Sequence, residues 1–361
     1  MCLVKKCAFG NLAPTLINGK RNFLIYFCDS ARLVDISISE GPEFWNLLSS
    51  SKENKEMNRD RMFVPVSISP YGFASLLGRF SFAAFAFVAA AVSACAQTDY
   101  AFKPINFPGA TATFAYALND SGEAVGFYTG GGCAQTSCAF TYSKGTYTSF
   151  ECVLENATEA FDINNKGQIV GAYSYYGGVA EFVYEGNNSC SPLGDPSANS
   201  VTEAFGVNSK GEIVGFYIDF SGNFNGFLYY NGTYRTIDCP GEAETQAFGI
   251  GEDGVIVGAY ANSTGGPWTG FSYKNGICNP ISYPGAASTY AAGMTKSGEI
   301  TGWYTDSSGV NNGFVLTGTT FTEVDAPNTS GTILFHPNDA GSIAGFDLNS
   351  TGNHGFIAVP K

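Results

Sequence analysis

The sequence predicts an all-β fold, a six-bladed β-propeller of four-stranded antiparallel blades. The first observation is a repeat, because close copies of GEIVGFY, residues 211–217, occur six times in the chain. The glycines that open the copies stand at positions 122, 167, 211, 254, 298 and 341, at intervals of 45, 44, 43, 44 and 43 residues. A constant period of about 40 to 50 residues is typical of propellers and solenoids, in which each unit packs on its neighbours.

The second observation is that each period contains four short strand patterns. In the third unit these are residues 203–208, 212–218, 226–230 and 233–238, all rich in β-branched and aromatic residues. The turn NSKG follows the first strand and suits a type I turn, and Asn231-Gly232 after the third strand is a strong hairpin signal. Two tight turns favour an antiparallel blade with its longer loops at the opposite face. A parallel β-helix is the alternative, although its coils need no such hairpins.

The third observation concerns how the ring closes. The sixth unit stops at Lys361 after three strand patterns. The missing fourth pattern occurs at the other end of the repeat, because AFKPINFPG at residues 101–109 matches the fourth-strand endings ISYPG and IDCPG. We therefore expect the N-terminal strand to complete the last blade and to leave no unpaired blade edge.

The segment before the repeat predicts export. Arg79 precedes an uncharged run at residues 80–92, and the small-residue stretch SACAQ follows it. A basic flank, a short apolar region and an A-x-A site are typical of a secretory signal peptide, and the run is shorter than the roughly 20 residues of a membrane span. We therefore assign residues 57–96 to a signal peptide and residues 100–361 to the propeller, with no transmembrane span in the mature protein.

Two points about the N-terminal segment stay open. Residues 1–56 precede the signal, and Met57 opens a charged segment, MNRDRMF, that suits the start of a signal peptide. We interpret residues 1–56 as the product of a start codon assigned too early, with a genuine extension as the alternative. Cleavage after Ala96 would give an extracellular or periplasmic protein, whereas lipid attachment would give a lipoprotein anchored at Cys95.

Charge and cysteines narrow the range of partners. From Gln97 onward, 8 Lys and Arg stand against 24 Asp and Glu, so we expect no nucleic-acid partner. Six cysteines follow the signal, which suits an oxidising compartment. Cys133 and Cys138 share one loop and are the predicted disulfide, with a metal site as the alternative, and the other pairings stay open. We expect no metal and no cofactor, because the G-x-G-x-x-G at residues 249–254 leads into a strand rather than the helix of a dinucleotide site.

The repeat resembles a known family. The spacing A-x-x-I-N-x-x-G-x-I-V-G-x-Y, followed by a Gly-Phe strand, is similar to the HAF-repeat family of extracellular bacterial proteins. At the positions of the family's His-Ala-Phe, this chain reads Cys138-Ala139-Phe140 in the first unit and His354-Gly355-Phe356 in the last, and the Phe is kept in all six units. The resemblance covers residues 100–361 and implies a secreted repeat protein. It implies no catalytic residue.

The loops between the second and third strands differ most among the units, so we expect function there. They carry the aromatic residues Tyr175, Tyr176, Phe220 and Trp268, and Trp303 lies on an adjoining strand. Aromatic rings among short polar side chains suit a carbohydrate, whose CH faces stack on rings while its hydroxyls meet polar groups. These residues predict a non-catalytic, monomeric module that binds a glycan or a partner protein. Packing within the loops is the alternative interpretation.

An enzyme, a propeller-type glycan hydrolase or lyase, is the second function that we consider. It requires two converging carboxylates, and Glu159 and Glu203 in the repeated TEAF, with Glu244 nearby, are the clustered candidates. Their recurrence at one strand position favours a structural role. Asp162 and His336 occupy a position that is Ala or Gly in the other four units, but they belong to units 2 and 6. We therefore expect the ring to keep them apart and to form no catalytic pair.

Overall fold

The computed structural model describes residues 99–361 apart from 153–156, 187–188, 195–197 and 200, together with three strands near the N-terminus. The chain divides into two units, Met1–Ala84 and Phe85–Lys361. The first contains the antiparallel strands β1 (Thr15–Ile17), β2 (Lys20–Asp29) and β3 (Arg32–Ser39). The predicted signal peptide, residues 57–96, lies outside the described residues, and its boundaries stay a prediction. Within the described residues, no helix is long and apolar enough to cross a membrane.

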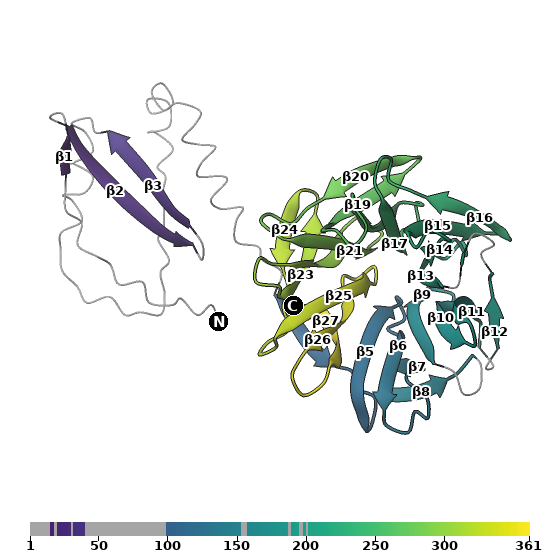
Figure 1. Ribbon diagram of the computed structural model, residues 1–361. Coiled ribbons are helices and arrows are strands. Elements are labelled where there is room, and N and C mark those ends of the chain that lie inside the picture. Colours follow the sequence, from purple (N-terminus) through teal and green to yellow (C-terminus); the bar gives the residue numbers. More distant parts are fainter. Residues whose placement is uncertain are drawn as a thin grey trace, which may run out of the picture. The chain divides into compact units, whose positions relative to one another are not determined.

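The second unit is a ring of six four-stranded antiparallel sheets within residues 99–361, as predicted (Figure 1). Blades 1 and 2 consist of β5 (Ala110–Leu118), β6 (Ala124–Gly130), β7 (Cys138–Ser143), β8 (Thr146–Phe150), then β9 (Thr158–Ile163), β10 (Ile169–Tyr175), β11 (Gly178–Tyr184), β12 (Cys190–Pro192). Blades 3 and 4 consist of β13 (Thr202–Val207), β14 (Ile213–Ile218), β15 (Phe224–Tyr230), β16 (Thr233–Ile237), then β17 (Glu244–Ile250), β18 (Ile256–Ala261), β19 (Trp268–Lys274), β20 (Ile277–Ile281). Blades 5 and 6 consist of β21 (Ser288–Met294), β22 (Ile300–Thr305), β23 (Asn311–Thr317), β24 (Thr320–Glu323), then β25 (Gly331–Pro337), β26 (Ile343–Leu348), β27 (His354–Pro360), β4 (Tyr100–Pro104). The first strand of each blade lies innermost, around the channel axis.

The N-terminal strand closes the ring, which confirms the prediction. β4 pairs antiparallel with β27 from Phe356 opposite Pro104 to Pro360 opposite Tyr100. At the ends of this pairing, Ile105 N donates to Gly355 O at 2.7 Å, and Lys361 N donates to Asp99 O at 2.8 Å. The last blade therefore has its fourth strand, and its outer edge is formed by the segment that begins the propeller.

The repeated residues have structural roles that recur in every blade. The Phe of the third strand is fully buried in the first five blades, and Phe356 of the sixth is 4% exposed. Gly215 in β14 lies so close to the backbone carbonyl of Glu203 in the inner strand that a Cβ would collide with it. Gly211 closes the first turn with a φ of 80°, in the left-handed region that favours glycine. These contacts explain why each unit repeats the two glycines of the pattern G-x-x-x-G.

The repeated Asn of the first turn also joins neighbouring blades. Asn208 Oδ1 accepts hydrogen bonds from Lys210 N at 3.0 Å and Glu212 N at 3.1 Å, which fixes its own turn. Its Nδ2 donates to Gly251 O of blade 4 at 3.2 Å, and Asn164 Nδ2 of blade 2 donates to Asn208 O at 3.0 Å. One side chain therefore holds both a turn and a blade border.

Three disulfides occur among the described residues. The expected bond between Cys133 and Cys138 closes one loop of blade 1. The other two, Cys152–Cys190 and Cys239–Cys278, join the outer strand regions of blades 1 and 2 and of blades 3 and 4, which the sequence had left open. Three disulfides are typical of proteins from an oxidising extracellular or periplasmic compartment.

Candidate functional site

Aromatic side chains fill the middle of the channel. Each inner strand has a β-bulge, and the bulged position is aromatic in five blades: Tyr116, Phe161, Phe205, Phe248 and Phe335. In blade 5 this position is Ala292, and the ring of Trp303 from β22 takes the space, 6.0 Å from Phe248 and 5.2 Å from Phe335 between ring centroids. The rings pack together, and one cavity lies on each side of them.

The first cavity opens on the face that carries the variable loops and measures about 480 Å³. On one wall, Tyr290 of β21 stacks on Trp303, with centroids 4.7 Å apart and ring planes at 11°. Gln246, Thr305 and Asn311 add polar groups to the lining, and Thr305 Oγ1 donates to Asn311 Oδ1 at 2.8 Å. We call this the loop-face cavity. It offers a rigid aromatic surface with amide and hydroxyl groups beside it.

Two of the three candidate carboxylates lie beside the channel. Glu159 and Glu203 occupy the same inner-strand position in neighbouring blades, the position that Gln246 takes in blade 4. Burial, with a smaller contribution from the charge of Glu159, raises the pKa of Glu203 to about 7. Burial also raises the pKa of Glu159, although a hydrogen bond from Ser137 Oγ at 2.8 Å opposes the shift. Glu244 is different, because it is 2% exposed and accepts a hydrogen bond from Gly265 N at 3.0 Å, which holds a loop.

The five predicted aromatic residues fall into two groups. Trp303 lines the loop-face cavity, and Trp268 lies at the border of blades 4 and 5, where its ring centroid is 6.1 Å from that of Tyr290. Tyr176 is fully exposed, Phe220 is 78% exposed and Tyr175 is 43% exposed. These three lie on the loops of blades 2 and 3, and none of them lines the loop-face cavity. The structure therefore brings the two tryptophans together through Tyr290, which sequence reasoning did not single out.

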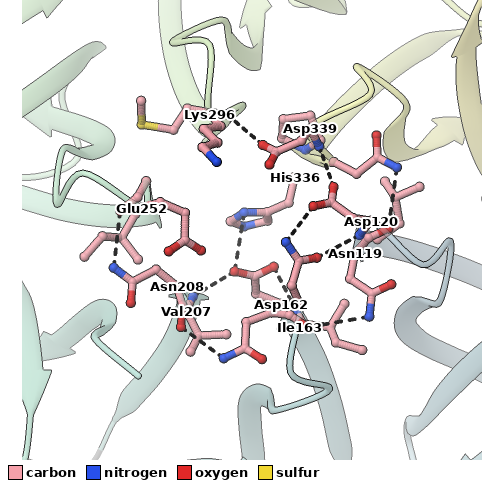
Figure 2. Close-up of a pocket in the computed structure, with 18 residues that line it drawn as sticks. Asn119, Asp120, Asp162, Ile163, Val207, Asn208, Glu252, Lys296, His336 and Asp339 are labelled. Atoms are coloured by element: carbon pink, nitrogen blue, oxygen red, sulfur yellow. Dashed lines mark hydrogen bonds and ion pairs between the residues drawn. The ribbon is translucent and has the colours of Figure 1, made fainter. Parts of the chain in front are cut away.

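The second cavity, of about 70 Å³, lies at the face of the short turns (Figure 2). Asp162 and His336 meet there, with His336 Nδ1 3.7 Å from Asp162 Oδ2. The expectation that the ring keeps these residues apart is wrong. Their shared position on the inner strand faces the axis, where blades separated by blade 1 still come into contact. The sequence signal for this pair was that two units carry Asp162 and His336 at a repeat position where the other four units carry Ala or Gly.

The environment of this pair is closed and polar. Asp162 is 7% exposed and His336 is 6% exposed. Asp162 accepts hydrogen bonds from Ile163 N at 2.8 Å and from Val207 N at 2.7 Å. Burial raises the pKa of Asp162, whereas the charge of His336 and the two amides lower it. His336 Nε2 is buried and has no hydrogen-bond partner among the described residues. No group of three or more His, Cys, Asp or Glu side chains in the described part of the chain could hold a metal ion.

Comparison with known proteins finds solved structures of similar fold but no family to which the chain can be assigned. No family model matches the chain, and no curated protein matches it. A gluconolactonase from Xanthomonas campestris is 11% identical with a TM-score of 0.48, over 75% of this chain and 93% of that one. TolB from Acinetobacter baumannii is 10% identical with a TM-score of 0.46, over 70% of this chain, which spans 64% of that protein. A fucose-specific lectin from Aleuria aurantia is 12% identical with a TM-score of 0.41, over 73% of this chain and 96% of that one. The resemblance to HAF repeats stays a prediction.

Proposed function

We propose that this protein is an exported, monomeric binding module that holds a neutral glycan in the loop-face cavity. The observation that carries the proposal is the stacked pair of Tyr290 and Trp303 beside the polar groups of Gln246, Thr305 and Asn311. A sugar ring presents an apolar CH face to such a pair and hydroxyls to such amides. The cavity volume also falls within the range of about 300 to 1,000 Å³ that is usual for ligand pockets.

Charge and compartment support the same proposal. The residues from Gln97 onward carry 24 acidic against 8 basic side chains, which disfavours sulfated or uronic-acid ligands. The signal-peptide pattern at residues 57–96, the three disulfides and the resemblance to HAF-repeat proteins all favour an exported protein. Export places the module where glycans of cell surfaces and of the surroundings are within reach. A partner protein on the same face is the other ligand class that we considered, but the polar, pocket-sized cavity favours a sugar.

The test is a glycan array with the purified protein, followed by titration calorimetry on each neutral hit. Trp303→Ala and Gln246→Ala should each weaken binding tenfold or more, a loss of about 1.4 kcal/mol. Tyr176→Ala is the matched control, because it removes a fully exposed ring that lies outside the cavity. Thermal melts must accompany Trp303→Ala, since this ring also packs in the channel. The proposal fails if no neutral glycan binds, or if both cavity variants bind as the unaltered protein does.

A glycan hydrolase or lyase is the alternative function, and one observation favours it. The raised pKa of Glu203, about 7, keeps part of its population protonated at neutral pH, next to Glu159 on the neighbouring inner strand. Acid–base cleavage of a glycosidic bond needs a protonated carboxyl as the general acid, and Glu203 is the group that would take this role. The test is release of reducing or unsaturated ends from any glycan that binds, with Glu203→Gln as the variant. Turnover that Glu203→Gln abolishes would establish the enzyme, and binding without turnover would leave the binding module.

A further inference from the structure

A groove lies at the border of blades 4 and 5, on the same face as the loop-face cavity. It measures about 260 Å³, and its aromatic walls are Tyr260, Trp268 and Tyr283. Polar groups stand between these rings: Glu242, Asn262, Ser282 and Ser288. We call this the border groove. Like the loop-face cavity, it combines aromatic faces with hydroxyl and amide groups, and Glu242 adds a carboxylate.

Hydrogen bonds and stacking hold the walls of the border groove in place. Trp268 N donates to Ser288 Oγ at 3.1 Å, which ties blade 4 to blade 5 beside the tryptophan ring. Tyr283 stacks on Tyr304 with centroids 3.7 Å apart and planes at 6°, and its N donates to Thr289 Oγ1 at 3.0 Å. A ligand that enters this groove therefore meets rings that are already positioned, which lowers the entropic cost of binding.

The border groove and the loop-face cavity share one aromatic surface. The centroid of Trp268 lies 6.1 Å from that of Tyr290, and Tyr290 in turn stacks on Trp303 in the cavity. Tyr290 thus joins the two sites across the blade border. Most other blades have no aromatic ring at the position of Trp268. Blade 3 has Phe224 there, and the remaining four blades have Ser137, Val179, Asn311 or Asn353.

We propose that the ligand is a linear, neutral glycan chain of at least two sugar units, one in the loop-face cavity and the next in the border groove. This inference rests on the proposed function and names the ligand class of that site. A linear chain presents a CH face on successive units, which matches successive ring surfaces, and hydroxyls along both edges, which match the polar groups between the rings. Glu242 in the groove and the acidic surface of the propeller disfavour an anionic chain.

The experiment measures affinity against chain length. The probes are a cello-oligosaccharide series from glucose to cellohexaose and a xylo-oligosaccharide series, titrated by calorimetry into the full protein. We expect affinity to rise tenfold or more from the single sugar to the longer chains of the series that binds. Trp268→Ala should remove most of this gain with chain length, whereas Trp303→Ala should weaken the affinity for every length.

Two controls separate folding effects from binding effects. Trp268→Phe keeps an aromatic wall and should retain most of the gain with chain length. Tyr176→Ala should change nothing, since its ring is fully exposed on another blade. Affinity that is independent of chain length, or a Trp268→Ala variant that keeps the full gain, would refute binding of a sugar unit in the border groove. Neither result would contradict binding in the loop-face cavity. Absence of binding to every neutral glycan on an array would instead overturn the proposed function itself.

Discussion

Replacement of His336 by alanine should destabilise the propeller by about 3 kcal/mol at neutral pH. The position accepts a small residue, because it is Ala117 in blade 1 and glycine in three other blades. Removal of one partner from a buried ion pair costs about 3 to 5 kcal/mol, since the remaining charge stays buried without compensation. Asp162 is 7% exposed, but it keeps the amides of Ile163 and Val207 as donors, which places the expected loss at the lower end of this range.

The sign of the pH dependence follows from the pKa of Asp162, which burial raises above its ordinary value. A carboxyl group with a raised pKa in the folded state lowers stability above that pKa, and this cost disappears as the pH falls towards the unfolded pKa. Without His336 the pKa of Asp162 should rise further. The loss in His336→Ala should therefore be larger at pH 7 than at pH 5. The other charged groups that line the second cavity, Glu252 and Lys296 among them, are the same in the His336→Ala variant and in the unaltered protein.

Urea denaturation at pH 5 and pH 7 measures these losses. The matched variant is Asp162→Asn in the His336→Ala background, because asparagine removes the charge and keeps one of the two oxygens that accept backbone hydrogen bonds. It should recover about 1 kcal/mol of the loss at pH 7 and show little dependence on pH, since the buried charge is gone but one backbone N–H loses its acceptor. A loss below about 1 kcal/mol in His336→Ala at pH 7, or a double variant as unstable as the single one at pH 7, would refute this account.

Three further predictions concern stability. Deletion of residues 100–104 should lower the melting temperature and cause association through the exposed edge of β27, whereas deletion of residues 1–7 should do neither; coinciding melts would contradict the closure. Loss of Cys152–Cys190 should cost about 4 kcal/mol of unfolding free energy, and loss of Cys133–Cys138 about 2 kcal/mol, because the two bonds close segments of 38 and 5 residues. Equal losses in denaturant titrations would argue against this entropic effect. Glu203→Gln should stabilise the protein by at most about 3 kcal/mol at pH 8 and hardly at pH 4, because its raised pKa of about 7 costs stability only above the unfolded value; a gain that is independent of pH would be contrary evidence.

The sequence predicted the blades because their determinants are local and occur six times. The glycine and the asparagine of the first turn and the buried Phe of the third strand each act within one blade or at its border. One correct interpretation therefore applies to every unit. The closing strand was predictable for the same reason, since residues 101–109 carry the signature of a fourth strand. The disulfide between Cys133 and Cys138 was expected because both residues lie in one short loop.

Contacts across the channel and across blade borders were decided by the tertiary structure. The meeting of Asp162 with His336, the filling of the space beside Ala292 by Trp303, and the link from Trp268 through Tyr290 all join residues of different strands or different blades. A repeat determines what each residue does within its own unit, through backbone hydrogen bonds and burial that depend on a few neighbours in sequence. The distance between two units depends instead on how all six blades pack around one axis, and that packing brings together side chains whose separation along the chain carries no information about it.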